Sequence, residues 1–201
     1  MSPTPRKQIM ELSSSKGLIR SNELVRLGAT PTTIARLVEQ GQLERVARGI
    51  YMKADREPSD LDNLVEVSLR VPKSIFCLLT ALSLHGVTTE MPHEAWIGLE
   101  YGGKKPRFDF PPVRIIKFSG EAFTYGVETK IISGVPLRVT SVAKTVADCF
   151  KHRNTIGLEV AIEALKDGWK KKLFTIDDLN KAAQINRVRN VMRPYVEMVL
   201  A

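Results

Sequence analysis

The chain has 201 residues, which is enough for one domain of ordinary size or for two small ones. Hydrophobic residues make up 43% and charged residues 26%, a balance typical of a folded protein, so a disordered chain is excluded. The formal net charge is +8, and residues 1–58 and 141–201 each carry a net +4, whereas residues 59–140 are neutral. This basic excess favours an acidic polymer such as DNA as a partner, although lysine-rich surfaces are often only solvated.

The two cysteines and the hydropathy pattern indicate the cellular compartment in which we expect the protein. Cys77 and Cys149 both lie in apolar runs, so we expect buried small hydrophobes in a reducing environment rather than a disulfide. No apolar span of 18 residues occurs, and the basic N-terminal residues are not followed by the apolar segment of a signal peptide. We therefore expect a cytoplasmic protein.

Two short helices are predicted near the N-terminus, after a first helix over residues 6–15. Ser21 can cap the first of the two, and Gly28 can end it. Thr30 followed by Pro31 is typical of the start of the second, because proline at the first helical position loses no useful donor. The side chains that we expect to point inward from these helices are Leu24, Val25, Leu27, Ile34, Leu37 and Val38.

The opposite face of the second helix is polar and can form hydrogen bonds. Two short strands, 43–46 and 49–52, are then predicted, with a tight turn that carries Arg48 at its tip. Two helices across a short turn, followed by a basic hairpin, indicate a winged helix-turn-helix, whose second helix enters a major groove. The DNA-binding residues that this predicts are Thr32, Thr33, Arg36, Gln40, Arg45 and Arg48. A small α/β subdomain that binds nothing, or a winged helix that binds protein, is the alternative.

A polar, proline-containing linker after Met52 suggests two domains, a DNA-binding domain at 1–58 and a second domain at 59–201. In the second domain we expect a helix over 60–70 and a central buried helix over 74–85, where nearly every side chain is apolar. Short β-branched runs then indicate a small, mostly antiparallel sheet, with a hairpin turn at Ser133-Gly134. The runs are 95–99, 113–118, 127–132 and 136–139.

Helices resume after the strands. Ser141 can cap a helix over 142–150, and Thr175 with Asp177 and Asp178 opens another that runs to about residue 185. Helices over 156–169 and 188–200 complete the pattern. The fold class that we expect is α+β, with an N-terminal winged helix-turn-helix and a mixed α/β C-terminal domain.

Several residue patterns resemble catalytic sites without completing them. Ser141 and Lys144 have the Ser-x-x-Lys spacing of penicillin-recognising enzymes, but no partner motif is present, so we expect a helix cap and a surface lysine. Cys77, His85 and His93 fit no metal-ligand spacing. Asp148 has no second carboxylate in view for metal-dependent hydrolysis. We expect no enzyme, no metal and no cofactor.

Several stretches of the chain together match the pattern of a known family. The first begins at Gly17-Leu18-Ile19 and runs through Val46-Ala47-Arg48-Gly49-Ile50-Tyr51. Three later blocks follow: Thr80 to Val87, Val139 to Asp148, and Gly157 to Leu165. In these stretches the chain resembles the AbiEi antitoxins of type IV abortive-infection systems.

This resemblance implies a protein that represses its own operon by binding inverted repeats in the promoter through a winged helix. It also implies that the C-terminal domain counters a nucleotidyltransferase-like toxin encoded alongside, without a stable complex. The expected partners are thus double-stranded DNA and, functionally, a toxin, with no membrane; oligomerisation on DNA stays open. Three alternatives stay open: an enzyme such as a nuclease delivered to DNA, a stand-alone regulator without a toxin, and an adaptor that binds protein.

Overall fold

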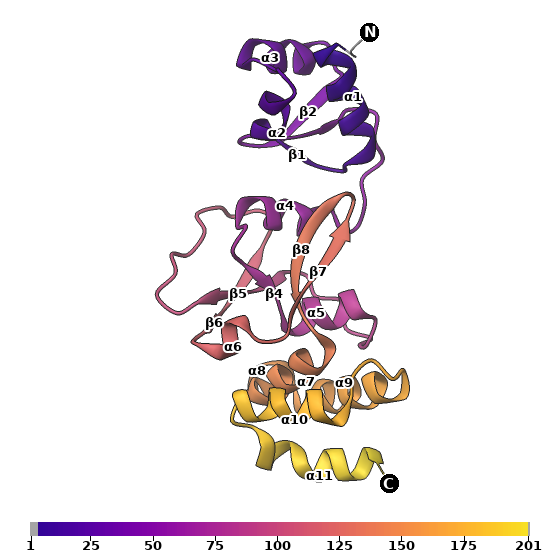
Figure 1. The fold of residues 1–201 in the computed structure, drawn as a ribbon, viewed down its shortest axis with the longest axis vertical. Helices are drawn as coiled ribbons and strands as arrows, with labels where there is room; N and C mark the ends of the chain where they lie inside the picture. Colours follow the sequence, from indigo (N-terminus) through magenta and orange to yellow (C-terminus); the bar gives the residue numbers. More distant parts are fainter. Residues whose placement is uncertain (1–3, 201) are drawn as a thin grey trace. The chain divides into compact units, whose positions relative to one another are not determined.

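The computed structural model describes residues 4–200 as an α+β protein with two sheets (Figure 1). The chain forms two compact units. Unit 1 contains the described residues up to Pro72 together with Lys130–Leu137, and unit 2 contains Lys73–Thr129 and the residues from Arg138 onward. These limits are not the expected division at 58/59, because residues 59–72 and a segment from the middle of the chain belong to unit 1.

Unit 1 begins with three helices and a three-stranded antiparallel sheet of order β1-β3-β2. Its elements are α1 (Pro5–Ser15), β1 (Ile19–Arg20), α2 (Ser21–Arg26), α3 (Pro31–Glu39), β2 (Leu43–Ala47), β3 (Ile50–Lys53) and α4 (Asp62–Arg70). One apolar cluster joins the helices to the sheet, and its buried members include Ile9, Ile19, Leu24, Ile34, Leu37 and Leu43. The expected inward faces are therefore confirmed, except at Val25, which is 52% exposed.

The segment 130–137 is held in unit 1 by hydrogen bonds to its carbonyl groups. The Gly17 N–H donates to the Ser133 carbonyl over 2.9 Å, and the Ser68 hydroxyl donates to the Pro136 carbonyl over 3.1 Å. Gly17 lies so close to this segment that a Cβ there would come within 2.7 Å of the Ser133 Cβ. Unit 1 is thus completed by a part of the chain that follows Pro72 by many residues.

The second sheet has five strands in the order β6-β5-β4-β8-β7. They are β4 (Ile75–Phe76), β5 (Ala95–Glu100), β6 (Val113–Phe118), β7 (Val127–Ile132) and β8 (Val135–Thr140). β4 pairs antiparallel with β5, but β4 with β8 and β5 with β6 are parallel. The prediction of a mostly antiparallel sheet is therefore wrong, and the sheet is mixed. The long connection between β5 and β6 permits the parallel pairing, which a tight turn does not.

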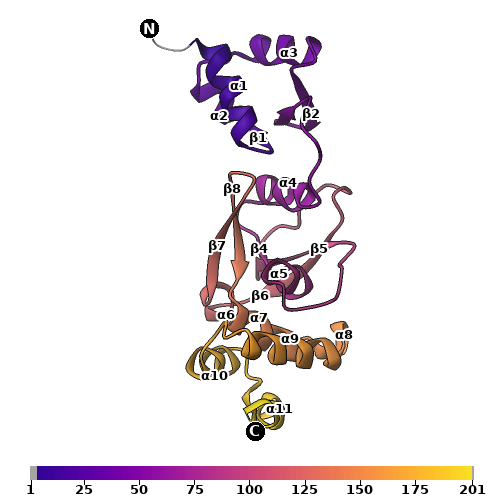
Figure 2. The ribbon, with the colours of Figure 1, turned by 90° about the vertical axis from the view of Figure 1, so that its right-hand side faces the viewer.

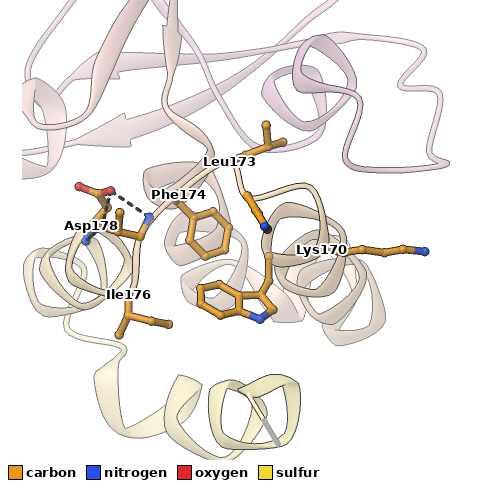
Figure 3. Close-up of a pocket in the computed structure, with 8 residues that line it drawn as sticks. Lys170, Leu173, Phe174, Ile176 and Asp178 are labelled. Carbon is orange, nitrogen blue, oxygen red and sulfur yellow. Dashed lines mark hydrogen bonds between the residues drawn. The ribbon is translucent and has the colours of Figure 1, made fainter.

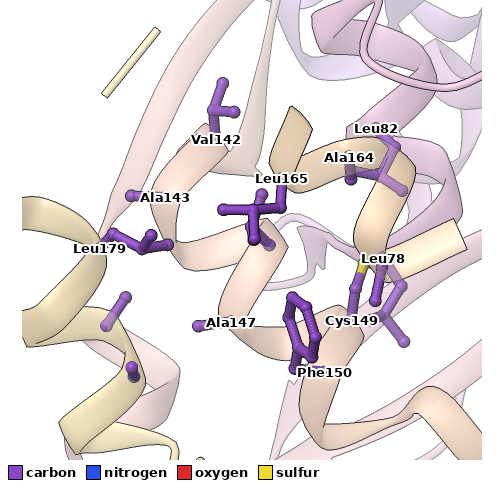
Figure 4. Close-up of a cluster of buried hydrophobic side chains, with 14 of the residues drawn as sticks. Leu78, Leu82, Val142, Ala143, Ala147, Cys149, Phe150, Ala164, Leu165 and Leu179 are labelled. Atoms are coloured by element: carbon purple, nitrogen blue, oxygen red, sulfur yellow. The ribbon is translucent and has the colours of Figure 1, made fainter. Parts of the chain in front are cut away.

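The helices that follow α4 all lie in unit 2 (Figure 2). They are α5 (Leu78–His85), α6 (Glu121–Thr124), α7 (Val142–Lys151), α8 (Arg153–Ile156), α9 (Leu158–Lys170), α10 (Ile176–Ile185) and α11 (Arg189–Leu200). α7 packs against α5, α9 and α10, and nine of its residues are buried, from Val142 to Phe150. Figure 4 shows the resulting apolar core, to which Leu78 and Leu82 of α5 and Cys149 and Phe150 of α7 belong.

A charged pair lies inside this apolar core. Lys144 and Asp148 are both fully buried, one turn apart on α7, and the Lys144 ammonium donates to Asp148 Oδ1. The Asn186 amide donates to the same oxygen over 2.7 Å. Lys144 Nζ also lies 4.6 Å from the centre of the Phe118 ring, which adds a cation–π contact. The expected surface lysine is therefore a core residue, because a carboxylate one turn later compensates its charge.

Two further expectations are corrected by the structure. Residues 74–85 do not form one helix: Ile75 and Phe76 form β4, and the helix begins only after Cys77, whose backbone is extended. Ser21 is not the N-cap of α2, since Arg20 takes that position and its N–H donates to the Glu23 carboxylate over 3.0 Å. The caps at Thr30, Ser141 and Thr175 are confirmed.

Candidate nucleic-acid interface

The turn between α2 and α3 is fixed by local hydrogen bonds. The Gly28 N–H donates to the Val25 carbonyl over 2.9 Å and the Ala29 N–H to the Leu24 carbonyl over 3.1 Å. The Thr30 hydroxyl then accepts from the Thr33 N–H over 3.1 Å, which satisfies one of the free donors at the start of α3. α3 therefore starts at a defined residue, and its register relative to α2 is fixed.

The predicted DNA-binding residues on α3 differ in how exposed their side chains are. Thr32 and Arg36 are exposed, and Gln40 is exposed at the C-cap, so all three can reach a ligand. Thr33 is half-buried, and its hydroxyl lies 2.9 Å from that of Thr30. Thr33 is thus partly committed to the cap, and of the candidates on this helix it is the least available to a partner.

The hairpin of β2 and β3 presents the other two candidates. Arg45 and Arg48 are both exposed, and Arg48 lies in the turn before Gly49. Gly49 has a φ of +72°, a backbone conformation that residues other than glycine rarely adopt. The Gly49 carbonyl accepts a hydrogen bond from the Ser21 N–H over 2.8 Å. That bond ties the hairpin turn to the start of α2. The Arg45 Nε donates to the Ala47 carbonyl over 3.4 Å, which leaves its other guanidinium donors available.

Four of the nine acidic residues of unit 1 are paired with basic residues other than these arginines. Ion pairs join Lys16 to Glu23, Lys53 to Asp55, Arg56 to Asp62 and Arg70 to Glu66. Burial raises the pKa of Asp62, but the hydrogen bonds from Arg56 and Ser59 outweigh it, so the pKa lies below its ordinary value and the group stays charged. In the described part of the chain, Arg36, Arg45 and Arg48 form no ion pair. Their charges are therefore available to phosphates.

One further exposed basic residue near α3 was not predicted from the sequence. Arg26 is exposed in the last turn of α2, two residues before the turn that leads into α3. It too forms no ion pair within residues 4–200. The signal was present in the sequence, since Arg26 is the one basic residue between Asn22 and Thr33. The winged helix-turn-helix pattern assigns DNA contacts to the second helix and the hairpin, and therefore did not predict a contact from the first helix.

The other candidate chemistry does not assemble into a site. His85 Nε2 lies 2.7 Å from the Thr140 carbonyl, and burial raises the pKa of the Cys77 and Cys149 thiols well above their ordinary value. Within residues 4–200, no cluster of three histidine, cysteine, aspartate or glutamate residues could hold a metal ion. In the same described range, no helix is both long enough and apolar enough to span a membrane.

Comparisons with known proteins bear on the first part of the chain and on the fold. Over its whole length the chain is similar to the crystal structure of the RV2827C protein from Mycobacterium tuberculosis, with a TM-score of 0.64 and 13% identity. The match covers 82% of that protein, and at this identity it shows the fold alone. No curated protein matched the sequence. A family model described as "Transcriptional regulator, AbiEi antitoxin" matches residues 7–52, the segment from α1 to β3. The resemblance noted from the sequence is therefore confirmed over this segment, which is similar to transcriptional regulators of the AbiEi antitoxin type.

Proposed function

We propose that the protein is a sequence-specific DNA-binding repressor of its own operon. The observation that supports the proposal is the exposed polar face of α3, together with an exposed arginine in the turn between β2 and β3; both features are expected of a winged helix-turn-helix. α3 has nine residues and is therefore about 13 Å long. A helix about 10–12 Å across fits the major groove, which is about 12 Å wide.

The residues divide by the kind of contact that each can make. Arg36 lies on the exposed face of α3, where a guanidinium can donate two hydrogen bonds to a guanine edge. Thr32 can contact a base or a phosphate from the first turn of the same helix. Arg45 and Arg48 lie on the hairpin and can follow the phosphate backbone. This division supports base reading by α3 and orientation by the hairpin.

The antitoxin function belongs to the same proposal. Countering a nucleotidyltransferase-like toxin without a stable complex is assigned to the part of the chain that follows the hairpin. The family match supports an antitoxin in general terms, but it ends at residue 52. That limit favours a second candidate, a stand-alone transcriptional regulator with no toxin partner. Co-expression separates the two, since only an antitoxin restores growth to cells that express the neighbouring toxin gene.

A gel-shift titration with the promoter fragment of the protein's own operon tests DNA binding. The Arg36→Ala variant should bind this fragment about 5- to 150-fold more weakly, because a bidentate arginine–guanine contact contributes about 1–3 kcal/mol of discrimination. Its affinity for a shuffled fragment of equal length should change by less than threefold. The matched control is Arg189→Ala, which removes one exposed arginine from α11 in unit 2. Equal weakening on both fragments would show that Arg36 contacts only phosphate, and no binding to either would refute the proposal.

A further inference from the structure

The loop between β5 and β6 is exposed and carries both aromatic and basic side chains. It runs from residue 101 to residue 112 with the sequence Tyr-Gly-Gly-Lys-Lys-Pro-Arg-Phe-Asp-Phe-Pro-Pro. Of the aromatic side chains in residues 4–200, only Tyr101 and Phe110 are exposed, at 78% and 64%, and both belong to this loop. An aromatic ring in water forgoes the free energy of burial, so two such rings in one loop indicate a surface that a partner covers.

Hydrogen bonds fix the turn that presents Tyr101. The Tyr101 N–H donates to the Phe118 carbonyl at the end of β6 over 2.7 Å, and the Gly103 N–H donates to the Glu100 carbonyl over 2.9 Å. The Lys117 ammonium donates to the Gly103 carbonyl over 2.6 Å, which brings a cation from β6 to the same turn. The turn is thus attached to the sheet, and little ordering is needed when a partner binds it.

Basic groups predominate around this turn. Lys104, Lys105 and Arg107 are exposed in the loop. Together with Lys117 they form no ion pair within residues 4–200. The acid of the loop is Asp109, so these four basic groups stand against one carboxylate and the net charge is +3. The loop therefore favours a partner with several negative charges.

The acids at the two ends of the loop do not change this balance. Glu100 lies beside Phe118 in the parallel pair of β5 and β6. Because successive side chains of a strand point to opposite faces, Lys117 lies on the other face of the sheet from Glu100. At the other end, the Arg114 Nε pairs with the Glu94 carboxylate over 2.6 Å, so these two charges compensate each other.

Aromatic rings elsewhere in unit 2 are less accessible. Figure 3 shows the apolar hollow where α9 ends and α10 begins, in which Phe174 lies between Leu173 and Ile176. Phe174 is only 8% exposed, and charged side chains of both signs, Lys170 and Asp178 among them, line the hollow. A flat ligand cannot stack on a buried ring, whereas the exposed rings of the loop can be reached from solvent.

We propose that this loop binds single-stranded nucleic acid. One base stacks on the Tyr101 ring and a second on Phe110, while phosphates of the strand pair with Lys104, Lys105 and Arg107. Stacking on a side chain requires an unpaired base, which a single strand offers. The proposal goes beyond promoter binding and does not depend on it, because all of these residues lie in unit 2.

Other partners fit the loop less well. Duplex DNA keeps its bases stacked inside the helix, so it can use the lysines but not the Tyr101 ring. A membrane surface favours contiguous apolar side chains, but three cations separate the two exposed rings along the chain, and Asp109 adjoins the second. An acidic peptide gains most of its affinity from an apolar anchor in a pocket, whereas Tyr101 and Phe110 are themselves exposed.

Fluorescence anisotropy with labelled oligothymidine and oligouridine of about 12 nucleotides, within the usual site size, tests the proposal. Tyr101→Ala should weaken binding about 5- to 150-fold, the effect of losing one stacked base, and Tyr101→Phe should keep it within twofold of the wild type. An abasic strand of equal length should lose less than twofold with Tyr101→Ala, because it has no base to stack. The tighter of the two base-containing strands identifies DNA or RNA as the natural source.

The charges of the loop supply a second readout. The double variant Lys104→Ala/Lys105→Ala should flatten the slope of log affinity against log salt by about 1.4 units, since each phosphate contact on a single strand contributes about 0.7. Asp109→Asn should tighten binding, a result that misfolding cannot produce. Lys181→Ala on α10, which removes an exposed lysine outside the loop, should leave the affinity within twofold.

Arg48→Ala separates the loop from the hairpin of unit 1. It should leave binding of the single strands within twofold, and Tyr101→Ala should leave the promoter gel shift within twofold, so either proposal can fail alone. The loop proposal is overturned if a folded Tyr101→Ala variant binds as the wild type does, or if it loses as much affinity for the abasic strand. It is also overturned if Asp109→Asn does not tighten binding, or if phosphatidylglycerol vesicles or polyglutamate bind more tightly than the single strands.

Discussion

Replacing Lys144 by methionine should destabilise unit 2 strongly. Both members of the Lys144–Asp148 pair are fully buried, and the remaining carboxylate would keep only the Asn186 amide as a partner. Breaking one side of a buried ion pair costs about 3–5 kcal/mol, because the other charge stays out of water and unpaired. For a protein of this size the loss corresponds to a fall in melting temperature of about 6–20 °C.

The size of this loss should depend on pH. Burial raises the pKa of Asp148, while Lys144 and Asn186 oppose the rise, so removing Lys144 should raise the pKa further. A carboxyl group whose folded pKa lies above its unfolded value contributes stability that is complete below about pH 4 and is lost as the pH rises through the folded pKa. The deficit of Lys144→Met relative to the wild type should therefore be smaller at pH 5 than at pH 7.

Tryptophan fluorescence during urea unfolding measures this deficit for unit 2 alone. Both tryptophans, Trp96 and Trp169, lie in unit 2. The double variant Lys144→Met/Asp148→Asn should recover at least half of the loss, since no uncompensated charge then remains buried. A deficit below about 1 kcal/mol at pH 7, with an unchanged urea dependence, would refute the reasoning.

Three further predictions concern unit 1 and a turn in unit 2. Arg48→Ala should weaken binding to promoter and shuffled DNA by similar factors. In titrations at four or five salt concentrations, it should also reduce the slope of log affinity against log salt by about one unit. An unchanged slope would exclude a phosphate contact. Thr30→Ala removes the side-chain cap of α3 and should cost about 1 kcal/mol of unfolding free energy in urea denaturation, whereas Thr32→Ala should cost less than half of that. Gly157→Ala should lower the melting temperature, because Gly157 has a φ of +95°, a conformation that residues with a Cβ rarely adopt. An unchanged melting temperature would show that the turn adapts.

The secondary structure was largely predictable where local signals agree. Thr30-Pro31 and Thr175 with its following acids predicted helix starts that the structure confirms. The 74–85 segment failed because an unbroken apolar run fits both a buried strand and a buried helix. Pairing with distant strands determines that this segment starts as a strand: Ile75 and Phe76 pair with β5, and Phe76 also pairs with Val139 of β8. No signal within the run contains that information.

The buried charges were the least predictable feature of the sequence. Lys144 and Asp148 have the i,i+4 spacing that is common on solvent-exposed helix faces, so the sequence favours a surface pair. Their burial follows from α5, α9 and α10, which enclose α7. The candidate DNA interface was more accessible to sequence reasoning. The exposure of Thr32, Arg36 and Arg48 follows from helix and hairpin periodicity, whereas the engagement of Thr33 by Thr30 required the structure.

The division of unit 1 along the chain has a consequence for its synthesis. Residues up to Pro72 leave the ribosome first. The segment Lys130–Leu137 is complete only about 65 residues later, and it accepts the hydrogen bonds from Gly17 and Ser68. At about 5–20 residues per second this delay lasts roughly 3–13 s. During that interval the nascent α4 lacks part of its final environment. A ribosome stalled before Lys130 should therefore display an α1-to-β3 region that resists protease and an α4 that protease still cleaves.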